Sequence, residues 1–284
     1  MLNHRNVPFA AAFAGMVSVQ TGAAFAKTLF PLVGSEGVAA LRLGLSSLVL
    51  VAALKPWRLN FRDAGISWLT MLTYGITLAL MNLLIYRAFA YIPVSVAISI
   101  EVMGPLCAAL LTSRRASDLV WIALAALGMV GLAIGDVKGE IDVRGVAFSL
   151  AAALFWGIYV LVGRRASAGG GQSVAVGMTI AAVIAVPLGV AQAGTALAST
   201  HVLLVGFSVA VLSSMLPFLL DIYAMRRLPA RVFGVLLSGS PAVSAIAGWL
   251  VLNETLTPTQ CAGIACVVAA CAGCALFSRP RAEA

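Results

Sequence analysis

The sequence has few charged residues and few histidines, and these shortages exclude several classes of protein. Only 10% of the 284 residues are charged, whereas 62% are hydrophobic, and the mean hydropathy is +1.05. A water-soluble domain of this length needs far more polar side chains on its surface. Long apolar runs separated by short basic loops are instead typical of a polytopic membrane protein.

The sequence also lacks the motifs that carry most enzyme chemistry. It has no HExxH sequence, no nucleophile elbow and no cluster of metal ligands, and its two histidines, His4 and His201, would lie near opposite membrane faces. A phosphate-binding GxxxxGKS/T loop is missing too, which excludes direct use of ATP. We therefore predict a protein that is not an enzyme and that needs no metal and no cofactor.

Acidic residues are scarcer than basic ones, at 10 against 18, so the net charge is +8. A basic chain can bind nucleic acid, but here the basic residues occur in doublets at the ends of apolar runs rather than in one patch. That distribution follows the positive-inside rule of membrane proteins. It predicts a lipid bilayer as a partner and argues against nucleic acid.

Cysteine is infrequent, and its five copies form no recognisable site. All lie inside apolar segments, four of them in the last one. The pair Cys271-x-x-Cys274 on a lipid-embedded helix lacks the surroundings of a redox or zinc motif. We expect these cysteines to serve as small residues in helix packing.

What the sequence does contain is ten apolar runs of about 20 residues, the length that spans a bilayer as an α-helix. The first run carries Gln20 and is long enough to span, so we expect it to be retained rather than cleaved as a signal. These runs predict an all-α membrane protein with ten transmembrane helices. The ranges are 7–29, 36–54, 64–86, 92–112, 118–134, 145–163, 174–194, 201–223, 231–251 and 258–277.

The basic residues predict the orientation of these helices. If the N-terminus is cytoplasmic, the cytoplasmic side receives 13 of the 18 basic residues, so both termini are predicted to lie inside. Five helices in each half then make residues 1–137 and 138–284 an inverted repeat, an arrangement typical of secondary transporters with a site near the midplane. The 13 residues are Arg5, Lys55, Arg58, Arg62, Arg114, Arg115, Arg164, Arg165, Arg226, Arg227, Arg231, Arg279 and Arg281.

One unusual helix pattern occurs in both halves. Pro93 and Pro105 enclose eleven residues that include Glu101, and the same spacing returns in the second half. Pro105 leaves the Glu101 carbonyl without its helical partner, and hydrocarbon tolerates this only beside a cavity or another polar group. We expect a central site flanked by these helices. The expected hinges are Pro93, Pro105, Pro217, Pro229 and Pro241.

The inverted arrangement and the paired proline helices resemble the drug/metabolite transporter superfamily in its ten-helix EamA-type branch, over essentially the whole chain. Several stretches are similar to the threonine and homoserine exporters of the bacterial inner membrane, with aromatic amino-acid exporters as near relatives. One position departs from the exporter pattern, because Ser240 stands where an acidic residue precedes the proline. The similar stretches are Gln20–Lys27, Phe30–Gly34, Ala40–Leu43, Glu101–Pro105, Ser113–Arg115, Trp156–Tyr159 and Asn253–Pro258.

The resemblance implies a secondary transporter that exports small amino acids across the inner membrane by alternating access. Threonine and homoserine are the leading substrates, and other neutral or aromatic amino acids come next. An exporter of drugs, other metabolites or lipids is the alternative on the same fold. Coupling to protons, and the choice between a monomer and a homodimer, stay open.

Two charged residues are the first candidates for binding such a substrate. A charge at the centre of a membrane helix costs at least about 2.5–3.5 kcal/mol, so Glu101 is expected to pair with the substrate ammonium or to carry a proton. Its structural alternative is an ion pair with Lys27 or Arg42. Arg42 suits a substrate carboxylate through its planar fork, and its alternative is a salt bridge to Glu36 or Glu101.

Other polar and aromatic residues complete the predicted site. Lys27 shares a helix face with Gln20, although it can also extend to the interface. Asp221 follows Pro217, which frees the Ser213 carbonyl, and is expected either in a gate or paired with cytoplasmic arginines. The remaining predicted binding residues are Tyr74, Asn82, Tyr86, Trp156, Tyr159, Ser238 and Ser240.

Overall fold

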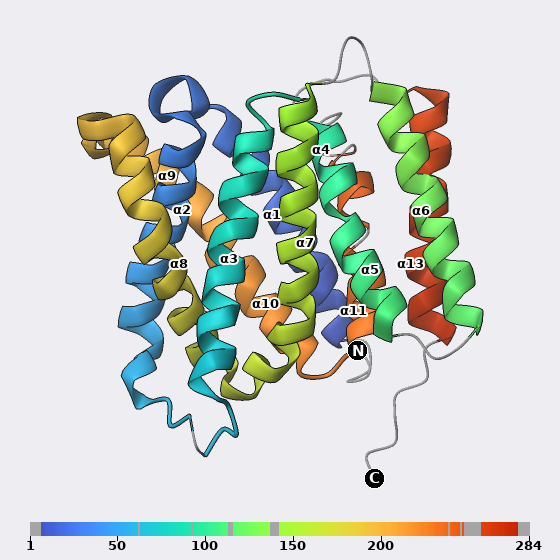
Figure 1. Ribbon diagram of the computed structural model, residues 1–284, viewed down its shortest axis with the longest axis horizontal. Coiled ribbons are helices and arrows are strands. Elements are labelled where there is room, and N and C mark those ends of the chain that lie inside the picture. The colour runs from blue at the N-terminus through green and yellow to red at the C-terminus, as the bar shows by residue number, and fades with distance from the viewer. Residues whose placement is uncertain are drawn as a thin grey trace.

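The structure is a computed structural model that describes residues 7–61, 63–92, 94–112, 116–136, 142–237, 239–244, 246 and 257–277 (Figure 1). Within these ranges the chain is all α-helical and has no β-strand. The long helices are α1 (Val7–Lys27), α2 (Phe30–Leu54), α3 (Trp68–Ala88), α6 (Ala116–Asp136), α7 (Val143–Ala166), α8 (Gly170–Ala193) and α13 (Pro258–Phe277). The shorter ones are α4 (Val94–Glu101), α5 (Met103–Thr112), α9 (Thr200–Ala210), α10 (Leu216–Met225) and α11 (Ala230–Leu237).

Apolar helices make up most of the described chain. Four helical stretches are long and apolar enough to cross a membrane: Phe30–Leu54, Trp68–Ala88, Val143–Ala198 and Thr200–Met225. The third of these contains both α7 and α8. Where the side chains are described, the apolar parts of the other helices are 10–17 residues long, and part of the predicted ninth segment lies outside the described residues. Each predicted apolar run nevertheless contains at least one described helix, although the ninth run is described only in part.

Several predicted helices are broken rather than continuous. The run 92–112 divides at Val102, directly after Glu101, and the run 201–223 contains a π-helical turn, Val211–Met215, before Pro217. A turn also interrupts the ninth run at Gly239. Proline removes a backbone donor, which explains the break before Pro217. The breaks in the fourth and ninth runs follow Pro93 and Pro229 at nearly the same distance along the chain.

The helices pack in pairs that join the two halves of the chain. Helix α2 lies along α8, α6 along α13, α3 along α7, α1 along α10 and α5 along α11 (Figure 1). Small residues allow the closest approaches, as expected for helix packing in membranes. A Cβ on Gly234 of α11 would come 2.5 Å from the Pro105 carbonyl oxygen of α5, and one on Gly104 would overlap the Ala153 carbonyl oxygen of α7.

Exposed arginines mark one end of the bundle. Arg58 follows α2, Arg164 and Arg165 end α7, and Arg226 and Arg227 follow α10; all five are exposed. The connections after α2, α7 and α10 all lie at the lower end of the bundle in Figure 1. The basic connections therefore gather at one end, as the sequence pattern predicts.

The buried core forms two main clusters. The larger one includes Tyr74, Tyr159 and Phe233 and reaches Ile66 and Leu228 beside the lower connections. The other includes Leu29, Tyr86, Ala88 and Ile92 near the opposite ends of α2 and α3. The region between the two clusters holds the candidate site.

Gly104→Ala tests the close packing of α5 on α7. The new methyl group would overlap the Ala153 carbonyl oxygen, so we expect a loss of about 1–3 kcal/mol or more and a lower melting temperature in detergent. Gly131→Ala is the control, because its methyl group would meet nothing closer than 3.5 Å. There the helix propensity of alanine should leave stability unchanged or raise it. Equal melting temperatures for both variants would contradict the packing.

Candidate functional site

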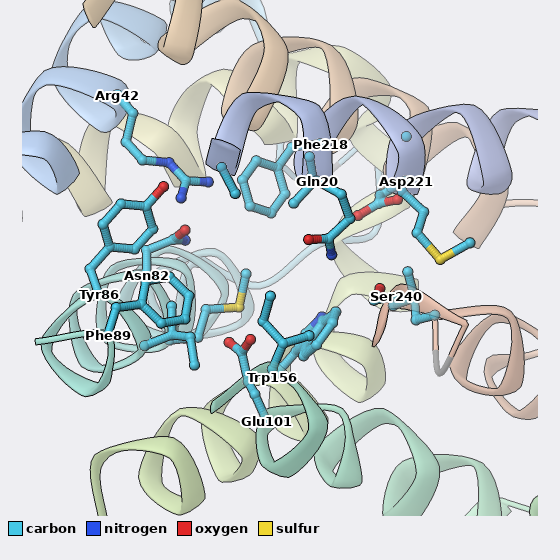
Figure 2. A pocket seen from close by; sticks show the side chains of 18 residues that line it. Gln20, Arg42, Asn82, Tyr86, Phe89, Glu101, Trp156, Phe218, Asp221 and Ser240 are labelled. Carbon is cyan, nitrogen blue, oxygen red and sulfur yellow. The ribbon is translucent and has the colours of Figure 1, made fainter. Parts of the chain in front are cut away.

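A cavity lies between the two core clusters, and side chains from α1, α2, α3, α4, α7, α10 and α11 line it (Figure 2). Its volume is about 90 Å³, enough for a few waters, each of which occupies about 30 Å³ in the liquid. Eight residues predicted from the sequence line this cavity. They are Gln20, Arg42, Asn82, Tyr86, Glu101, Trp156, Asp221 and Ser240.

Among the described residues that line the cavity, Arg42 carries the positive charge. Its side chain is only 4% exposed. Nε donates to the Ser214 hydroxyl at 2.9 Å, and Nη2 donates to the Ser213 carbonyl at 2.5 Å. The guanidinium carbon also lies 4.9 Å from the centre of the Tyr86 ring, within range of a cation–π interaction.

The predicted salt bridge from Arg42 to Glu36 or Glu101 is not formed among the described residues. Glu36 instead pairs with Arg87, whose Nη2 lies 2.5 Å from Glu36 Oε1 and whose Nε donates to the same oxygen at 2.6 Å. The reason is position, because Arg87 in the last turn of α3 reaches Glu36 near the start of α2. The positive charge of Arg42 is therefore not paired with a described carboxylate, and Arg42 lines the cavity.

The break between α9 and α10 is held by side chains from α1 and α2. Besides the Arg42 bond to Ser213, the Ser18 hydroxyl donates to the Leu212 carbonyl at 2.6 Å and the Ser46 hydroxyl donates to the Ala210 carbonyl at 2.9 Å. Pro217 cannot supply an N–H to the Ser213 carbonyl four residues earlier, so Arg42 provides that donor from α2. The expectation that the Ser213 carbonyl is available to a partner is confirmed.

Two carboxylates face the same cavity from different sides. Figure 2 shows Glu101 beside Trp156 and Asp221 beside Ser240, with Arg42 and Tyr86 across the cavity from both. No described cation lies within 4.0 Å of either carboxylate. The charges of the cavity are thus separated rather than paired with one another.

Asp221 contacts a buried tyrosine and not the arginines at the end of α10. The Tyr159 hydroxyl donates to Asp221 Oδ2 at 3.4 Å, and Asp221 is 7% exposed. Gly15 makes room for this carboxylate, since a Cβ there would lie 3.3 Å from Oδ1. The alternative in which Asp221 pairs with the cytoplasmic arginines is wrong for the described residues, where Arg227 covers the Tyr223 ring at 3.8 Å.

Polar and aromatic groups fill the remaining wall. The Asn82 side chain donates to the Leu78 carbonyl of its own helix at 2.7 Å, so the partner that a buried amide needs is local. The Tyr86 hydroxyl is buried and has no hydrogen-bond partner among the described residues. Gln20 extends into the cavity between Phe218 and Asp221 (Figure 2).

Some predicted site residues lie elsewhere. Tyr74 and Tyr159 stack with ring centres 5.5 Å apart in the core, and neither lines the cavity, although Tyr159 contacts Asp221. Lys27 belongs to α1, but its side chain is outside the described residues, as are Pro93 and Ser238.

The remaining expected hinge residues are described. Pro105, Pro217 and Pro241 are buried at or near helix breaks, and Pro229 directly precedes α11.

Sequence reasoning missed several residues of the site. Phe89, Phe218, Met81 and Gly15 line the cavity, and Ser214 bonds Arg42. Only Ser214 had a sequence signal, because it lies within one turn of Pro217. In the part of the chain that the structure describes, no group of three or more His, Cys, Asp or Glu residues could hold a metal ion.

Comparison with known proteins identifies the family. Residues 143–276 match the EamA-like transporter family. The chain is 44% identical over 279 residues to the threonine/homoserine exporter RhtA of Escherichia coli (strain K12), covering 98% of this chain and 94% of that protein. It is also 44% identical over 275 residues to RhtA of Salmonella typhimurium (strain SL1344), covering 96% and 92%.

A solved crystal structure shares the fold. It is 17% identical in sequence, superposes with a TM-score of 0.77, and covers 97% of this chain and 99% of its own. The resemblance predicted from the motifs is confirmed. The chain belongs to the EamA-like transporter family and is a multi-pass membrane transporter, not an enzyme.

Proposed function

We propose that this protein exports small amino acids, with threonine and homoserine as the leading substrates, across the bacterial inner membrane. The observation that carries this proposal is the 44% identity over 98% of the chain to a threonine/homoserine exporter. The cavity supports it, because Arg42 and the two carboxylates are opposite charges at separate positions. An amino-acid zwitterion offers a carboxylate and an ammonium, which need complementary groups in a site shielded from water.

In the proposed binding mode, Arg42 receives the substrate carboxylate, and Glu101, assisted by Asp221, receives the ammonium. Gln20, Asn82, Tyr86, Trp156 and Ser240 form the wall around the side chain, with Lys27 and Ser238 as further candidates. Tyr74 and Tyr159 support the wall from the core. This arrangement places mostly apolar lining around a few polar groups, as small-ligand sites require.

We further propose ten transmembrane helices in two inverted repeats, residues 1–137 and 138–284, with both termini in the cytoplasm. The helix pairs support this. In an inverted repeat α1 corresponds to α7, and α10 corresponds to α3. The packed pair of α1 with α10 therefore has its counterpart in the packed pair of α7 with α3. The gathering of exposed arginines at one end supports the orientation.

Alternating access would rock the third, fourth, eighth and ninth segments around the cavity. Pro93, Pro105, Pro217, Pro229 and Pro241 would act as the hinges. Protons are a possible second partner through Glu101, and a monomer and a homodimer are both compatible with the proposal.

Counterflow in proteoliposomes tests the function. Vesicles preloaded with unlabelled threonine or homoserine should accumulate labelled threonine, whereas vesicles without the protein should not. Accumulation of phenylalanine or methionine as well would extend the substrate class and assign Trp156 and Ser240 to a broader pocket. Failure with every amino acid would refute the proposal and favour drugs, other metabolites or lipids.

Glu101→Gln tests the ammonium site. Loss of the carboxylate should lower threonine exchange by about tenfold or more, because a hydrogen bond to a buried charge contributes about 1.5–3 kcal/mol. Asp63→Asn, a matched exchange in the exposed connection after α2, should leave exchange unchanged. Normal transport by Glu101→Gln at every pH would exclude both the ammonium and the proton role.

Cysteine labelling tests the orientation. In a variant without the native cysteines, Ser199→Cys in the connection between α8 and α9 should react with a membrane-impermeant maleimide added outside intact cells. Asp63→Cys, in the connection at the other end of the bundle, should react only after the membrane is opened. The reverse pattern would invert the proposed topology.

A further inference from the structure

The Arg42 guanidinium is held in one orientation by two hydrogen bonds. A guanidinium has five N–H donors, and Nε and Nη2 use two of them, on the Ser214 hydroxyl and the Ser213 carbonyl. Three donors remain (5 − 2), and they lie on Nη1 and Nη2. The edge formed by Nε and Nη2 is thus occupied, whereas the edge formed by Nη1 and Nη2 is free among the described residues.

The two partners of Arg42 are themselves firmly placed. Ser213 and Ser214 are fully buried in the π-helical turn. The backbone of α1 packs directly on this turn, since a Cβ on Gly22 would lie 2.7 Å from Ser213 Cβ. Ser18 and Ser46 donate to the Leu212 and Ala210 carbonyls, which precede Ser213 in the chain. The turn therefore fixes the direction of Arg42 before any ligand binds.

A second group beside Arg42 points to an oxygen acceptor as the ligand. The centre of the Tyr86 ring lies 4.9 Å from the guanidinium carbon, and Tyr86 is only 2% exposed. The Tyr86 hydroxyl has no partner among the described residues, although buried hydroxyls in proteins are normally hydrogen-bonded. Both Tyr86 and Arg42 line the cavity (Figure 2).

We propose that Ser214 is a positioning residue that selects which edge of Arg42 meets the substrate. By occupying Nε, it leaves the Nη1–Nη2 edge to bind the two carboxylate oxygens of an amino acid, with the Tyr86 hydroxyl as an additional donor. Planar bidentate contacts of this kind depend strongly on orientation. The inference rests on the proposed function, because a substrate without a carboxylate would not use this edge.

Ser214→Ala is the central test, measured as the KM and the maximal rate of threonine counterflow. Freeing Nε lets the guanidinium rotate, so the KM should rise about fivefold to tenfold while the maximal rate stays the same. Ser214→Thr restores the hydroxyl and should return the KM to within about twofold of the wild type.

Ser46→Ala is the matched control. It removes another buried serine hydroxyl that bonds the same helix break, but the Ser46 hydroxyl bonds the Ala210 carbonyl rather than Arg42, and Ser46 does not line the cavity. The variant should lower thermal stability and keep the KM. The comparison therefore distinguishes a general destabilisation of the helix break from a change in the orientation of the Arg42 guanidinium.

The outcomes separate this inference from the function on which it rests. A KM in Ser214→Ala equal to that of Ser46→Ala, with wild-type transport intact, overturns the role of Ser214. Loss of transport in both Ser214→Ala and Ser214→Thr also overturns it, because the hydroxyl is then not the feature that matters. Absence of counterflow in the wild type instead refutes the proposed function.

Discussion

One missing backbone donor organises the cationic side of the cavity. Pro217 has no N–H, so the Ser213 carbonyl needs a partner from elsewhere in the protein, since an unsatisfied carbonyl in hydrocarbon costs several kcal/mol. Arg42 of α2 provides that donor, and Ser18 of α1 and Ser46 of α2 donate to the nearby Leu212 and Ala210 carbonyls. These hydrogen bonds connect α1 and α2 to the turn before α10, and they leave the buried Arg42 guanidinium at the cavity wall.

The acidic side of the cavity is built differently. Glu101 ends α4 beside the break at Val102, and Asp221 has one long hydrogen bond, from Tyr159 at 3.4 Å. Neither carboxylate has a described cation within 4.0 Å, whereas Arg42 has two close hydrogen bonds. A ligand that carries an ammonium group would therefore gain most on the acidic side, and its carboxylate would meet an arginine that is already oriented.

The sequence was sufficient for the helices and for part of the site, but not for its long-range partners. Apolar runs locate the helices because spanning a bilayer sets their length, and Pro217 identified the free Ser213 carbonyl through a local rule. The alternative that pairs Arg42 with Glu36 or Glu101 is wrong for the described residues, and its actual partner Ser214 lies 172 residues away in the sequence. Tyr74 and Tyr159 were placed in the cavity because helices surrounded by lipid show little contrast between their faces; in the structure they stack in the core.

The difference between the two sides bears on how the transporter would move. The turn before Pro217 is bound to α1 and α2 at three carbonyls, so this turn would stay with α1 and α2 while α10 rocks about the hinge at Pro217. The fourth and ninth segments are instead broken at similar distances after Pro93 and Pro229, at Val102 and Gly239. Glu101 lies at one of these breaks, whereas Arg42 lies on α2. Rocking would then change the separation between the two charges, and a zwitterion that spans them would be bound in one state and released in the other.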